Sequence, residues 1–92
     1  MPKEIAVFIN LLQEKEVDLV KLFIGRKTAD SFEVPVNLMT SELLRLGFFT
    51  AKIITCACEY FSSKPNTVDM IVLLECLYSQ SKKKVKPLNL NV

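Results

Sequence analysis

Residues 31–38, with the sequence SFEVPVNL, decide between the two folds that this chain could adopt. Phe32 and each second residue after it are apolar, and they alternate with Ser, Glu, Pro and Asn. A period of two is typical of a β-strand with one buried face. Because Pro35 cannot donate a ladder hydrogen bond, we expect this strand at the edge of a sheet. Its backbone groups also require a partner strand.

The nearest partner for this strand is residues 17–24, which are rich in β-branched and aromatic residues and lack a clear helical period. We therefore predict a β-hairpin with a linker at residues 26–30. It would follow an amphipathic helix over residues 3–13, where apolar side chains recur at helical spacing. The alternative is an unbroken helix over residues 3–23, which would make the protein an all-α bundle.

The second half of the chain has the pattern of two or three helices. Thr40 or Ser41 is a good N-cap for the first of them, and Gly47 is a natural end or kink. Residues 49–62 predict a helix that is apolar around most of its circumference. A last helix is expected after Asn66 or Thr67. We therefore predict a helix-rich α+β fold, with one globular domain over residues 1–80 and a basic tail over residues 81–92.

The composition argues against ordinary catalysis. The 92 residues include no His and only two Gly, so the commonest general base, the commonest metal ligand and a Gly-rich phosphate loop are all missing. The three cysteines lie in apolar segments, and Cys56-x-Cys58 lacks the spacing of a zinc site. We expect a protein that is not an enzyme and that has no metal ion and no cofactor.

The apolar surface predicts a protein partner. Half of the residues are hydrophobic, and two of the expected helices are apolar on more than one side, which a small domain cannot cover alone. We expect a homodimer or a hetero-complex. The residues that we expect at a partner interface are Phe48, Phe49, Leu73, Leu77 and Tyr78.

The basic residues permit a second class of partner. Lys82, Lys83, Lys84 and Lys86 form a run without an acidic residue, in a chain of net charge +2. Such a run can be a solvated helix end, a nuclear import signal or a set of phosphate contacts. In the last case Arg45 and Lys52 are further candidates for nucleic-acid contacts.

Short segments of the chain resemble BTB/POZ domains of the elongin C type. Residues 20–22 and 31–34 resemble two strands of that family, residues 39–44 resemble a helix opened by Thr-Ser, and residues 57–61 and 68–77 resemble its central and closing helices. The third strand of that family has no counterpart here, and residues 1–16 are additional. The resemblance implies a non-catalytic adaptor that holds a partner's helix in a groove between its last helices.

The function that we expect from the sequence is a protein–protein interaction module or adaptor. The alternative is a small dimeric nucleic-acid-associated regulator that uses the basic tail. Arg45, Lys52 and Glu59 interrupt the most apolar stretch, and no secretory pattern stands at Met1, so we expect an intracellular protein, cytoplasmic or nuclear, without a membrane partner.

Overall fold

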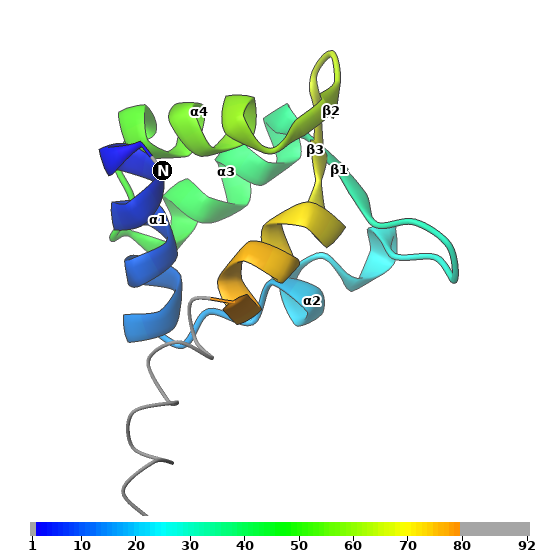
Figure 1. Cartoon of the computed structure of the whole chain (residues 1–92), viewed down its shortest axis with the longest axis horizontal. Helices are drawn as coiled ribbons and strands as arrows, with labels where there is room; N and C mark the ends of the chain where they lie inside the picture. Colours follow the sequence, from blue (N-terminus) through cyan, green and yellow to red (C-terminus); the bar gives the residue numbers. More distant parts are fainter. Residues whose placement is uncertain (1, 80–92) are drawn as a thin grey trace, which may run out of the picture.

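The computed structural model describes residues 2–79 as a small helix-rich α+β domain, which confirms the predicted fold class (Figure 1). The basic tail lies outside the described residues. The elements in chain order are α1 (Lys3–Glu14), α2 (Leu19–Leu22), η1 (Ile24–Arg26), β1 (Glu33–Pro35), α3 (Val36–Leu46), α4 (Ala51–Tyr60), β2 (Ser62–Lys64) and β3 (Thr67–Asp69). Residues 70–79 form a further helix, called the last helix below.

The three strands form an antiparallel sheet in the order β1-β3-β2. Strand β1 therefore lies at an edge, as Pro35 predicts. Its partner was predicted wrongly, however, because Val34 pairs with Val68 of β3 and not with a residue between 17 and 24. The segment expected to pair with β1 is joined to it only by an isolated bridge between Lys27 and Phe32.

Residues 17–24 contain α2 and the start of η1 instead of the predicted strand. Asp18 is the N-cap of α2, and its carboxylate accepts a hydrogen bond of 3.0 Å from the backbone N–H of Lys21. A local cap of this kind stabilises the first turn of a helix. In this segment the Asp18 cap stabilises a helix although the apolar residues that follow have a high β-propensity.

The β-hairpin of the structure lies at residues 62–69, where the sequence predicted only the end of one helix and the cap of the next. Lys64 and Thr67 pair across a two-residue loop of Pro65 and Asn66. Asn66 has a φ of +59°. Pro followed by a residue of positive φ is the arrangement that a type II turn requires. These residues therefore reverse the chain between two strands.

Helix α3 begins earlier than predicted, since Val36 directly follows β1 and the expected caps Thr40 and Ser41 lie inside the helix. It ends at Gly47, which has a φ of +91° in the left-handed region. Helix α4 begins at Thr50, whose hydroxyl accepts a 3.2 Å hydrogen bond from the N–H of Ile53. Both ends of the short connection between α3 and α4 are thus fixed by local hydrogen bonding and backbone stereochemistry.

A single core joins these elements. Helix α1 packs against α4, and α4 packs against α3 and the sheet. In Figure 1, α4 runs above α3, α1 crosses their ends, and the last helix returns from the hairpin beside α2. The buried side chains include Ile5, Phe8, Ile9, Leu12, Leu19, Phe32, Val34, Met39, Leu43, Ile54, Val68, Met70 and Leu73.

Candidate functional site

Helices α3 and α4 form a helix-turn-helix followed by a β-hairpin. Residues 47–50 make the turn, which has the length and the glycine typical of this motif. The hairpin of residues 62–69, called the wing below, follows α4 directly and projects from the body of the domain (Figure 1). The two strands of the wing and β1 form one sheet, with β3 in the centre.

Helix α4 presents a polar face to solvent. Its buried residues, Ile54, Ala57 and Cys58, anchor it in the core. Lys52, Thr55 and Glu59 are exposed. They follow one another at intervals of three and four residues, so they share one side of the helix. The second helix of this motif therefore offers one cation, one hydroxyl and one carboxylate to a ligand.

The wing adds a mostly uncharged polar edge. Ser62, Ser63 and Lys64 of β2 are exposed. The ammonium of Lys64 lies 3.1 Å from a carboxylate oxygen of Glu33 on β1. This ion pair reaches across the sheet and lowers the net positive charge that the wing presents.

The predicted nucleic-acid contacts are placed on different helices. Arg45 is exposed on α3, and its guanidinium is 3.1 Å from a carboxylate oxygen of Glu42. Lys52 is on the exposed side of α4 and has no ion pair within residues 2–79. Lys82, Lys83, Lys84 and Lys86 lie outside the described residues. Lys52 is thus the cation of α4 that is available to a phosphate.

The predicted partner interface is divided between two places, and two of its members lie in the core. Phe49 is 5% exposed and Leu73 is fully buried. Phe48 is half-buried, with its ring centroid 4.9 Å from that of Phe49. Leu77 is half-buried, whereas Tyr78 is 66% exposed. The two phenylalanines belong to the turn before α4, and the other three residues belong to the last helix.

Sequence reasoning missed the wing and the polar face of α4. The signal for the wing was the Pro65-Asn66 dipeptide, which lies between the two predicted helices and is equally a turn between two strands. Thr55 and Glu59 were missed because a largely apolar helix was assigned to the core as a whole. Their exposure depends on which side of α4 meets α1 and α3, and that follows from tertiary packing.

Burial makes two of the thiols, those of Cys58 and Cys76, weaker acids by raising their pKa. Burial raises the pKa of Cys58 above its ordinary value, and this outweighs the hydroxyl of Thr40, which lowers it. Burial also raises the pKa of Cys76. A protonated thiol is a poor nucleophile and a poor metal ligand. Residues 2–79 contain no group of three His, Cys, Asp or Glu side chains that could hold a metal ion.

Within the described part of the chain, no helix has the length and apolar character needed to cross a membrane. The resemblance to BTB/POZ domains stays a prediction, although residues 20–22, one of the segments that carried it, are helical. Comparisons of the chain with protein-family models, with curated proteins and with solved structures find no match.

Proposed function

We propose that this protein binds duplex nucleic acid, with α4 in a groove and the wing beside the backbone. The observation that supports this is the succession of α3, a four-residue turn, α4 and a projecting hairpin. In a helix-turn-helix the second helix enters the major groove, which is about 12 Å wide and admits one helix. The geometry therefore favours the nucleic-acid-associated regulator, which was the alternative function expected from the sequence.

The side chains on α4 suit different parts of the groove. Lys52 is in the first turn of the helix, where its ammonium can reach a phosphate or a guanine edge. Thr55 can donate to or accept from a base edge. Glu59 is an acceptor that suits only an amino group such as that of cytosine, and it repels phosphates. We therefore expect α4 to contribute orientation and selectivity more than affinity.

The affinity has to come largely from the tail. Removing its four lysines from the twelve cationic side chains leaves eight, against ten acidic ones, so the remaining chain is slightly acidic. Counterion release by cationic side chains supplies most of non-specific binding. The proposal therefore assigns phosphate contacts to Lys82, Lys83, Lys84 and Lys86, and predicts strongly salt-dependent binding.

Fluorescence anisotropy of the full chain with a labelled duplex of random sequence tests the proposal. We expect a Kd in the range of about 10⁻⁴ to 10⁻⁶ M near 0.1 M salt. The slope of log K against log salt concentration falls by about 0.9 for each phosphate contact that is lost. Lys52→Ala and replacement of the four tail lysines by Gln should each reduce this slope.

Lys21→Ala is the matched control for Lys52→Ala. Lys21 is also exposed, but it lies on α2, away from α4 in Figure 1. Its removal changes the net charge by the same amount and should leave the salt slope unchanged. If Lys52→Ala and Lys21→Ala reduced the salt slope equally, α4 would not be the binding helix. Absence of binding at about 100 μM protein in low salt would overturn the proposal as a whole.

The expected protein-interaction function remains the second candidate, because apolar side chains stand exposed on the last helix. Ile71 and Tyr78 are both exposed there. We infer that such a surface, if it holds a partner, acts independently of the basic tail. Replacing the tail lysines by Gln would then abolish binding to a duplex and leave association between proteins intact.

A further inference from the structure

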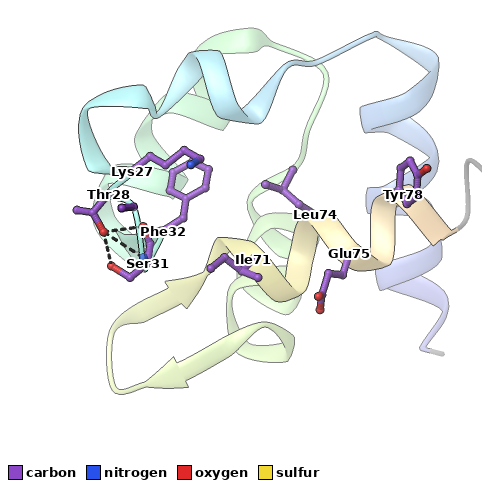
Figure 2. Close-up of a pocket in the computed structure, with 9 residues that line it drawn as sticks. Lys27, Thr28, Ser31, Phe32, Ile71, Leu74, Glu75 and Tyr78 are labelled. Carbon is purple, nitrogen blue, oxygen red and sulfur yellow. Dashed lines mark hydrogen bonds between the residues drawn. The ribbon is translucent and has the colours of Figure 1, made fainter.

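An apolar hollow lies between the last helix and the loop that leads into β1 (Figure 2). Its volume is about 310 Å³. Phe32 is buried in its floor. Ile71, Leu74 and Tyr78 line it from the last helix, and Figure 2 shows them along one side of that helix. Their spacing of three and four residues makes a continuous apolar strip.

In the loop that forms the other wall, Thr28 and Ser31 form hydrogen bonds with each other. The backbone N–H of Thr28 donates to the carbonyl of Ser31 at 2.8 Å. The N–H of Ser31 donates to the Thr28 hydroxyl at 3.0 Å, and that hydroxyl donates to the Ser31 carbonyl at 3.1 Å. Groups that are already paired lose little when water is removed. Burying Thr28 and Ser31 against another protein therefore costs little.

Two opposite charges line the hollow on different walls. Lys27 belongs to the loop and Glu75 to the last helix, and both are exposed. Within residues 2–79 neither forms an ion pair with any other residue. A partner that paired with both residues would need an acidic group opposite Lys27 and a basic group opposite Glu75.

We propose that the occupant is a second copy of this chain, related by a two-fold axis that passes over the hollow, between Lys27 and Glu75. A two-fold interface joins the same patch on both copies, so the patch has to complement itself. In this arrangement Glu75 faces the partner's Lys27, and Lys27 faces the partner's Glu75. The two strips from Ile71 to Tyr78 run antiparallel and cover each other's hollow.

A neighbouring hollow extends the surface across the last helix. Leu74 and Tyr78 also line this second hollow, of about 420 Å³, together with Leu12 and Gln13 of α1. Within residues 2–79 the side-chain Oε1 of Gln13 is buried without a hydrogen-bond donor, while its Nε2 donates to the carbonyl of Leu77. The two hollows share Leu74 and Tyr78, so they form one continuous surface on the last helix.

Sedimentation equilibrium of the full chain without nucleic acid tests the dimer, so its result is independent of the proposed function. We expect a concentration-dependent dimer. Lys27→Glu and Glu75→Lys should each weaken it at least tenfold, because each places like charges opposite each other. An equimolar mixture of these two variants should form a heterodimer, since each then offers the charges that the other requires.

Ile71→Lys and Val72→Lys are a matched pair on the same helix. The two side chains are 43% and 46% exposed, but only Ile71 lines the hollow. Ile71→Lys should make the protein monomeric, and Val72→Lys should leave the dimer unchanged. A wild-type chain that remains monomeric up to about 100 μM, equal effects of both substitutions, or a mixture that does not associate would overturn the proposal.

Discussion

Gly47 closes α3 in a backbone conformation that other residues avoid. Its φ of +91° lies in the left-handed region, and a methyl group added at its Cα would meet no atom within 4 Å. Any loss of stability caused by a side chain at this position therefore comes from backbone strain and not from crowding. This residue sets the direction in which the chain enters α4.

Gly47→Ala should lower the free energy of unfolding by about 1 kcal/mol, because an L-residue is strained at positive φ. Gly25→Ala is the control, since a methyl group there also meets open space but φ is not in that region. It should be neutral or slightly stabilising. Urea denaturation followed by circular dichroism measures both. Equal changes in the two variants would contradict the assignment of the cost to φ.

Stereochemistry at single residues was the part of the fold that the sequence predicted best. Gly47 as a helix end and Pro35 as an edge residue follow from each residue's own backbone limits, and both are confirmed. The N-cap at Thr40 or Ser41 was wrong, because a good capping residue can also lie inside a helix. Which role it takes depends on where the preceding strand ends.

At the scale of elements, Asp69 connects the wing to the last helix. Its backbone N–H donates to the carbonyl of Phe61 at 2.8 Å, at the base of the hairpin. Its side-chain Oδ1 accepts hydrogen bonds from the N–H groups of Ile71 and Val72 at 3.0 and 3.3 Å. The carboxylate thus caps the helix that carries the proposed dimer surface.

Asp69→Ala should cost about 1 kcal/mol of unfolding free energy, since it leaves the first N–H groups of the helix without this acceptor. Asp69→Asn keeps an oxygen in the same place and should retain most of the stability. Chemical denaturation of the three proteins at one pH checks this. If Asn proved as destabilising as Ala, the hydrogen bonds to Ile71 and Val72 would not be the source of the effect.

The pairing of strands was beyond the sequence analysis for a physical reason. An alternating pattern over residues 31–38 predicts a strand, but the partner of Val34 is Val68, which is far away in the chain. Periodicity describes one segment and says nothing about which other segment meets it. The partner strand was also hidden, because residues 67–69 are only three residues long and continue into a helix.

At the scale of the molecule, one hydrophobic cluster includes residues from α1 to the last helix. The polar face of α4 and the hollow beside the last helix involve different residues, so binding to a duplex and self-association can be separated by substitution. The sequence predicted that the partner is a protein or a nucleic acid, but it did not predict these two surfaces. The hollow gathers residues from segments that are distant in the chain, and the exposed side of α4 depends on how α4 packs against α1 and α3.

Phe8 tests whether this cluster unfolds as one unit. Its side chain is fully buried, and its ring centroid lies 5.4 Å from that of Phe49 at the turn before α4. Phe8→Ala should lower the unfolding free energy by about 3–5 kcal/mol, a large part of the roughly 5–15 kcal/mol typical of a domain. Calorimetry should still show one transition, at a lower temperature.

Val7→Ala is the control for this variant, because Val7 is the preceding residue of α1 but is exposed. Its effect should stay within about 0.5 kcal/mol. Because α1 packs against α4, loss of the Phe8 ring should destabilise the helix-turn-helix together with α1. Two separate transitions in Phe8→Ala would instead show that α1 unfolds independently, and α4 would then hold its orientation without it.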